Sequence, residues 1–95
     1  MPANSRILIV DDDPDIRKVL SLLLKDDYNV SEVADGSAAL EHMRLYPDTD
    51  LVILDVMMPG MNGYETCDKL REFSNVPVLF LTAKSAENDR ISAYG

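Results

Sequence analysis

The sequence contains a single cysteine, no cluster of lysine or arginine, and no long apolar run. Because Cys67 has no second cysteine to pair with, an internal disulfide is excluded, and a reducing cytoplasm is the expected location. The net charge is −8, so we expect no direct nucleic-acid binding by this segment, since contacts to phosphates require concentrated positive charge. The apolar run at residues 7–10 is too short for a signal peptide or a membrane span. We therefore expect a cytoplasmic protein without a membrane partner.

The rest of the composition is that of one small globular domain, with 46% hydrophobic and 27% charged residues in a chain of 95. Short apolar runs alternate with stretches of helical periodicity. The predicted strands are residues 7–10, 29–33, 51–54 and 78–81, and the predicted helices are residues 14–24, 36–46, 64–73 and 86–94. This alternation indicates an α/β fold, a doubly wound parallel sheet with helices on both faces.

The first predicted helix has a clear start. Asp13 is suited to the N-cap and Pro14 to the first helical position. Apolar residues then follow at helical spacing and predict one stripe, made of Ile16, Val19, Leu20 and Leu23. The strand at residues 29–33 is more polar than the others, which places it nearer an edge of the sheet.

Polar residues follow three of the predicted strands directly. Asp11 and Asp12 follow the first strand, Asp55 the third and Thr82 the fourth. Parallel strands carry their carboxyl ends to the same edge of a sheet, where ligands bind in such folds. We therefore expect these side chains to meet. Carboxylate oxygens suit magnesium, which also keeps several water ligands, so the carboxylates of this group predict a magnesium site.

A magnesium site of this kind could support phosphoryl transfer. Beside a bound cation, Asp55 would be an ionised oxygen nucleophile, which suits phosphoryl transfer to the carboxylate. Thr82 could then donate a hydroxyl hydrogen bond to a phosphoryl oxygen. The plainer alternatives are that Asp11 and Asp12 are loop charges and that Thr82 caps the next helix. A calcium-binding loop is disfavoured because the acidic run lacks glycine at its sixth position and glutamate at its twelfth.

Three segments, ILIVDDDPDIRKVL, LVILDVMMPGMNGYE and VPVLFLTAK, resemble the receiver domains of two-component response regulators in order and spacing. The resemblance implies a flavodoxin-like strand order. It also implies that Asp55 is the phosphoacceptor and that a sensor histidine kinase or phosphotransfer domain is the phosphoryl donor. By the same resemblance, Asp11 and Asp12 form the acidic pair, and Asp12, Asp55 and the Met57 backbone carbonyl bind magnesium. The family's remaining positions correspond to Pro59 and Gly63 in the loop, Thr82 as the hydroxyl that follows the phosphoryl group, and the small residue Ala83.

The chain also departs from the family. Receivers normally continue with a fifth strand, which ends in a lysine, and a fifth helix. Neither is present here, so residues 1–95 are expected to form a receiver domain that is incomplete at its carboxyl end. Lys84 lies at a helix-start position and is not assigned the lysine's role. Without a fifth strand, the strand at residues 78–81 would form a sheet edge, where we expect self-association.

Two other functional classes stay open. An aspartate-nucleophile phosphatase would also place an aspartate beside magnesium, but the haloacid dehalogenase family requires a second aspartate two residues later, where this chain has Met57. The chain is therefore not expected to be an enzyme. A protein-interaction module that works without phosphorylation is the other alternative. His42 is expected on the surface and Cys67 in the core. Met57, Met58 and Met61 are expected in loop packing.

Overall fold

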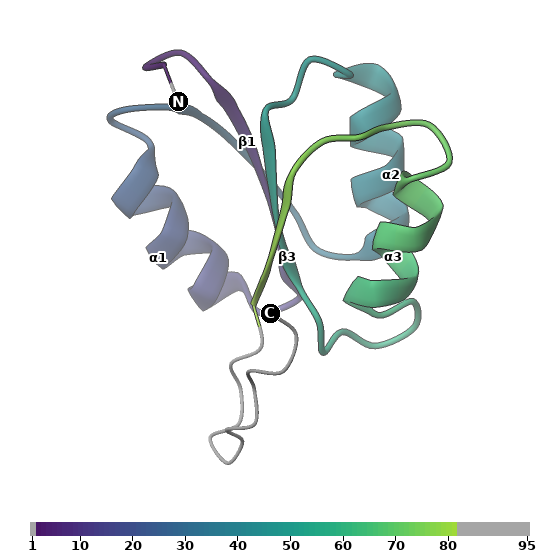
Figure 1. Ribbon diagram of the computed structural model, residues 1–95. Helices are drawn as coiled ribbons and strands as arrows, with labels where there is room; N and C mark the ends of the chain where they lie inside the picture. The colour runs from purple at the N-terminus through teal and green to yellow at the C-terminus, as the bar shows by residue number, and fades with distance from the viewer. Residues whose placement is uncertain (1, 82–95) are drawn as a thin grey trace.

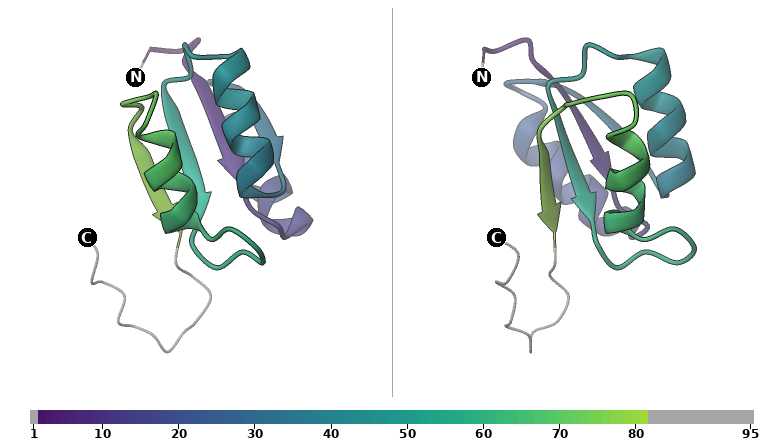
Figure 2. Two further views of the ribbon diagram at one scale, coloured as in Figure 1. Left: turned by 90° about the vertical axis from the view of Figure 1, so that its right-hand side faces the viewer. Right: turned by 45° about the vertical axis from the view of Figure 1, so that its right-hand side comes forward.

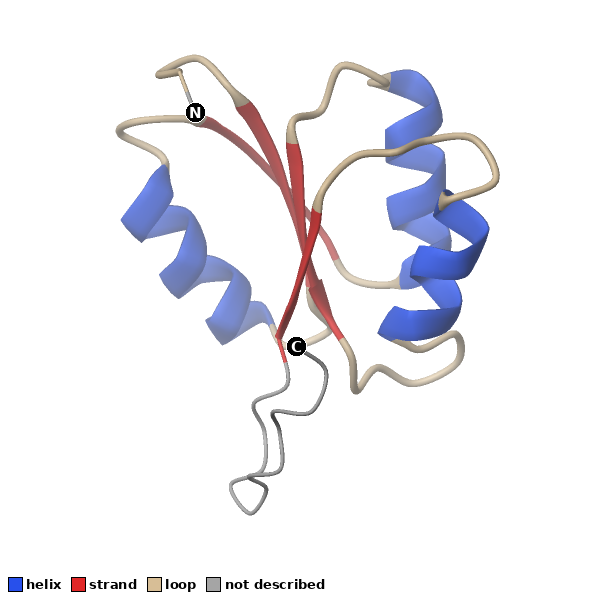
Figure 3. Cartoon of the chain, viewed as in Figure 1, coloured by secondary structure: helices blue, strands red, loops and turns tan. Residues whose placement is uncertain are grey.

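The computed structural model describes residues 2–81 as alternating strands and helices (Figures 1 and 3). Their order is β1 (Arg6–Val10), α1 (Pro14–Leu24), β2 (Asn29–Val33), α2 (Gly36–Leu45), β3 (Leu51–Asp55), α3 (Gly63–Leu70) and β4 (Val78–Leu81). The bounds agree closely with the sequence-based prediction, except that α3 ends earlier than expected, at Leu70. The predicted helix at residues 86–94 lies outside the described residues.

The four strands form one parallel sheet in the order β2-β1-β3-β4. This is the flavodoxin-like order. Helix α1 covers one face of the sheet, whereas α2 and α3 cover the other, and the strands all point toward the same edge (Figures 1 and 2). The predicted doubly wound parallel sheet is confirmed, and β2, the most polar strand, lies at an edge as expected.

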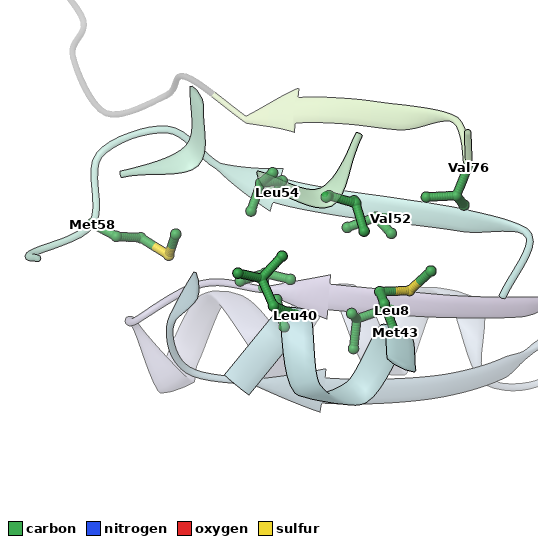
Figure 4. Packing of buried hydrophobic residues seen from close by; sticks show 10 residues of the cluster. Leu8, Leu40, Met43, Val52, Leu54, Met58 and Val76 are labelled. Atoms are coloured by element: carbon green, nitrogen blue, oxygen red, sulfur yellow. The ribbon is translucent and has the colours of Figure 1, made fainter. Parts of the chain in front are cut away.

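The main core lies between the sheet and helices α2 and α3 (Figure 4). Alternate side chains of the two central strands enter it, and the helices supply the facing side chains; its labelled members are Leu8, Leu40, Met43, Val52, Leu54, Met58 and Val76. Full burial of one such aliphatic side chain stabilises the fold by about 1.5–3 kcal/mol. Cys67 packs against this cluster, in agreement with its predicted core position.

The opposite face of the sheet has a thinner cover. Ile7, Ile9 and Ile53 are buried there, and Leu20 and Leu24 of α1 pack against them. Of the predicted α1 stripe, only Leu20 faces the sheet, since Ile16, Val19 and Leu23 are 41%, 55% and 70% exposed. The side that faces the sheet carries Arg17 and Leu24 beside Leu20. The helix is thus turned by about one residue, or about 100°, from the predicted orientation.

We expect the 95-residue chain to self-associate through the edge strand β4. Leu79 of β4 pairs in register with Ile53, so it lies on the α1 face, and it is 53% exposed. Within residues 2–81, β4 has a strand neighbour on one side only. An apolar strand edge of this kind promotes pairing with another copy. Light scattering on the purified chain should show dimers or larger assemblies, and Leu79→Lys should reduce them. A monodisperse monomer at high protein concentration would contradict this expectation.

Candidate functional site

Asp11 and Asp55 lie side by side because of the register of the two central strands. Val10 of β1 is paired with Leu54 of β3, so the next residue of each strand reaches the carboxyl edge at the same level. Both carboxylates are buried, with Asp11 4% and Asp55 3% exposed. Asp55 is also paired in register with Leu81 of β4, the residue before Thr82. The predicted site residue Thr82 itself lies outside the described residues, as do Ala83 and Lys84.

Asp12 completes a group of three carboxylates. One oxygen from each of Asp11, Asp12 and Asp55 lies within 4.8 Å of the others, and Asp12 is exposed while its two neighbours are buried. Like charges at about 4 Å repel by about 1 kcal/mol per pair in water and by several times more where protein replaces the water. A divalent cation would remove this cost, and an all-oxygen donor set with one open side suits magnesium. The structure thus brings together the three aspartates that the sequence predicted.

The loop that carries Asp11 and Asp12 is fixed by hydrogen bonds to its backbone. The Asp11 amide donates to the Val33 carbonyl of β2 (3.2 Å), and the Asp13 amide donates to Asp11 Oδ1 (2.9 Å). Asp13 is the N-cap of α1, as predicted, and Asp13 Oδ1 accepts a hydrogen bond from the Asp15 amide (2.9 Å). The start of α1 therefore determines where the acidic residues lie at the end of β1.

The loop from β3 to α3 contacts Asp55 directly. The Met57 amide donates to Asp55 Oδ1 (3.2 Å), and the Gly63 amide donates to the Val56 carbonyl (3.0 Å). A capping box then starts α3: the Asn62 side chain accepts from the Glu65 amide and the Glu65 side chain from the Asn62 amide, each at 2.9 Å. These contacts bring the backbone at Met57 beside the acidic group, but the role of the Met57 carbonyl as a metal ligand stays a prediction. The predicted loop packing of the Met57 side chain is wrong, since the residue is 65% exposed, whereas its neighbour Met58 is buried.

Gly63 is required here for space. A Cβ atom at this position would lie 2.8 Å from Val56 Cα and closer still to the Asp55 carbonyl oxygen, and both neighbours are backbone atoms that cannot move alone. We expect Gly63→Ala to destabilise the fold by about 1–3 kcal/mol and to weaken metal binding, because the β3 end must shift. Chemical denaturation measures the first effect, and metal titration the second.

Gly60 supplies the control for this prediction. It has a φ of 74°, but a Cβ atom added there would meet no other atom within 4 Å, so Gly60→Ala should cost only the backbone strain, about 1 kcal/mol. Equal stability losses, together with unchanged metal affinity in Gly63→Ala, would show that close packing at Gly63 does not support the site.

His42 takes no part in the acidic group. It packs against Tyr46 with the ring centroids 4.8 Å apart. Partial burial and, to a lesser extent, the charge of Arg6 lower the pKa of the His42 imidazole below 6.5. Arg6 begins β1 whereas Asp11 follows its end, so His42 lies toward the opposite edge of the sheet. His42 was predicted on the surface and is partly exposed. That it is not a ligand stays a prediction.

One contact of the site was missed by the sequence reasoning. The Arg17 guanidinium donates from Nη1 to the Asp11 carbonyl oxygen at 2.6 Å. Arg17 lies six residues after Asp11, on the helix that follows the acidic run, and this position was the sequence feature that could have indicated the contact.

Taken together, the fold and the site define a class of protein: a doubly wound α/β domain with an acidic pocket at the carboxyl edge of its sheet.

A family model described as the response regulator receiver domain matches residues 7–95, and the chain belongs to this family. Among curated proteins, it is 49% identical over 86 residues to the transcriptional regulatory protein YrkP of Bacillus subtilis, covering 90% of this chain and 36% of that protein. It is 48% identical over 82 residues to the DNA-binding response regulator MtrA of Mycolicibacterium smegmatis, covering 84% of this chain and 35% of that protein. The chain thus spans about a third of the length of these relatives.

Solved structures agree with this family. The fold is similar to chemotaxis protein CheY4 of Vibrio cholerae, with a TM-score of 0.78 and 34% identity over 93% of this chain and 76% of that one. It is also similar to the BeF3-activated receiver domain of RstA from Klebsiella pneumoniae, with a TM-score of 0.77 and 32% identity over 87% of this chain and 71% of that one. The protein is therefore a receiver domain of the two-component response regulator type. That residues 1–95 are an incomplete receiver stays a prediction.

None of the helices within residues 2–81 is both long and apolar enough to cross a bilayer.

Proposed function

We propose that the chain is a phosphoacceptor and that Asp55 receives a phosphoryl group from the phosphohistidine of a sensor kinase or phosphotransfer domain. The observation that carries this proposal is the convergence of Asp55 with Asp11 and Asp12 at the carboxyl edge of the sheet. The protein acts as a signalling module, and we expect no catalytic turnover of its own. Its expected location is the cytoplasm.

Magnesium would be held by Asp12, Asp55 and the Met57 carbonyl, with Asp11 completing the acidic environment. When bound, the cation would neutralise the combined negative charge of the three carboxylates and an approaching phosphoryl group. The donor chemistry fits, because every ligand is an oxygen and the pocket is open on the Asp12 side.

The transfer itself is a displacement at phosphorus. A carboxylate oxygen of Asp55 attacks, a phosphorus–oxygen bond forms, the phosphorus–nitrogen bond of phosphohistidine breaks, and its electron pair returns to the imidazole nitrogen. The chain's contribution is positioning: the Met57 amide orients the Asp55 carboxylate through the hydrogen bond to Oδ1. Thr82 would donate its hydroxyl to a phosphoryl oxygen once the aspartyl phosphate has formed.

The two curated relatives are named as a transcriptional regulatory protein and as a DNA-binding response regulator. For this protein we propose regulation of a partner or effector by the phosphorylated receiver. With a net charge of −8, the segment itself is not expected to contact nucleic acid.

Beryllofluoride, the ligand named for the activated RstA domain, provides the test. With magnesium present, fluorine NMR should show a bound species on the wild-type chain and none on Asp55→Asn. Omission of magnesium should remove the bound signal as well. If a folded chain that binds magnesium takes up no beryllofluoride, the phosphoacceptor proposal fails, and a phosphorylation-independent interaction module is favoured.

A further inference from the structure

We propose that Arg17 is a positioning residue that holds the acidic loop, residues 11–13, in the arrangement required for divalent-cation binding. The inference rests on the proposed function of that loop. Arg17 makes two contacts on different elements: Nη1 donates to the Asp11 carbonyl at 2.6 Å, and Nε lies 3.5 Å from Oε1 of Glu32 on β2. One guanidinium thereby ties the acidic loop to a strand of the sheet.

The Arg17 side chain is well placed to do this. It is only 19% exposed, compared with 37% for Glu32, and it shares the sheet-facing side of α1 with Leu20 and Leu24. A partly buried guanidinium is costly unless its donors are matched, and its planar fork suits two acceptors at once. The rotation of α1 that exposes Val19 and Leu23 is the same rotation that directs Arg17 toward Asp11.

The carbonyl that Arg17 binds belongs to the peptide unit that joins Asp11 to Asp12. Because this unit is planar, fixing its oxygen fixes the direction in which Asp12 leaves the strand. Within residues 2–81, the Asp12 side chain accepts no hydrogen bond that would orient it otherwise. The place of the proposed ligand Asp12 therefore depends on the backbone of Asp11 directly before it. The Val33 carbonyl accepts from the Asp11 amide, and Arg17 donates to the Asp11 carbonyl.

Arg17 could act as a nearby positive charge or as a positioning group, and these two roles predict opposite effects of its removal on magnesium affinity. If Arg17 acted only as a nearby positive charge, it would repel a divalent cation, and its removal would strengthen metal binding. If Arg17 positions the loop, its removal weakens metal binding despite the gain in negative charge. The sign of the change in magnesium affinity thus distinguishes the charge role of Arg17 from its positioning role.

The experiment compares magnesium affinity, by calorimetric titration, in the wild type, Arg17→Met, Arg17→Lys and Lys18→Met. Loss of a group that orients a metal ligand typically weakens affinity by about 10–100-fold, and we expect a loss of at least about tenfold in Arg17→Met. Lys18 is the matched control, because it is exposed and its replacement removes the same charge one residue away. Lys18→Met should bind as tightly as the wild type or slightly more tightly.

Arg17→Lys keeps the charge but offers a single ammonium in place of the fork, so it should restore part of the affinity lost in Arg17→Met while remaining weaker than the wild type. A readout without metal is hydrogen exchange at the Asp13 amide, which should be faster in Arg17→Met because the loop is less restrained. Equal or tighter magnesium binding in a folded Arg17→Met, or wild-type affinity in Arg17→Lys, would overturn the inference. A wild type that binds no magnesium would instead overturn the proposed function, and the inference with it.

Discussion

Replacing Asp55 with asparagine should abolish phosphorylation of the protein. In a version long enough to include the family's fifth strand, incubation with acetyl phosphate and magnesium should add about 80 Da to the wild type, as one acyl phosphate that is lost in alkali. The amide of asparagine is not a nucleophile of this kind, so Asp55→Asn should show no added mass. Intact-protein mass spectrometry measures the difference directly.

Asp68→Asn is a suitable control, because Asp68 is an exposed carboxylate on α3 and should not alter labelling. Alkali-labile label that persists in Asp55→Asn would show that the acceptor has been misplaced. Label on Asp68 or another exposed aspartate would show non-specific acylation instead.

Replacing Asp12 with alanine should remove most of the magnesium affinity. Asp12 supplies a direct ligand, and even the loss of an outer group that orients a ligand costs about 10–100-fold in metal affinity, so the loss of the ligand itself should exceed about 100-fold. Asp13→Ala is the matched comparison one residue later. It removes the N-cap of α1, at a cost of about 1 kcal/mol in stability, and leaves the carboxylate group intact.

The two variants should therefore separate metal affinity from stability. Calorimetric titration should report the loss in Asp12→Ala, and thermal melting without metal should report the loss in Asp13→Ala. The same magnesium affinity in Asp12→Ala as in the wild type would show that this carboxylate is not a ligand.

The fold was predictable because its local signals are strong and agree. Strands buried on both faces form continuous apolar runs in the sequence, such as residues 51–54, and the alternation with capped helices restricts the topology to a doubly wound sheet. The three aspartates were predictable for the same reason, since each follows a strand and parallel strands end at one edge. Thr82 followed the same logic and stays a prediction.

The rotation of α1 could not be predicted, because its apolar residues extend around most of the helix. Ile16, Val19, Leu20, Leu22, Leu23 and Leu24 offer more than one apolar side. In the orientation that the structure shows, the Arg17 guanidinium reaches oxygen atoms of both Asp11 and Glu32. These two partners come together only when β1 and β2 pair. The need for glycine at position 63 was likewise hidden, because it depends on how closely α3 approaches the end of β3.

The central position of β1 in the sheet affects how the protein folds while it is being synthesised. Its main-chain partners on one side belong to β3, where Ile7 is paired with Leu51, more than forty residues later in the chain. Translation at roughly 5–20 residues per second leaves several seconds in which β1 has been synthesised but β3 has not. During that time an apolar strand with one unpaired side is available to other nascent chains or to chaperones. Parallel pairing over such separations is also slow to form, so folding of this domain should begin late in its synthesis and depend on the arrival of Leu51–Asp55.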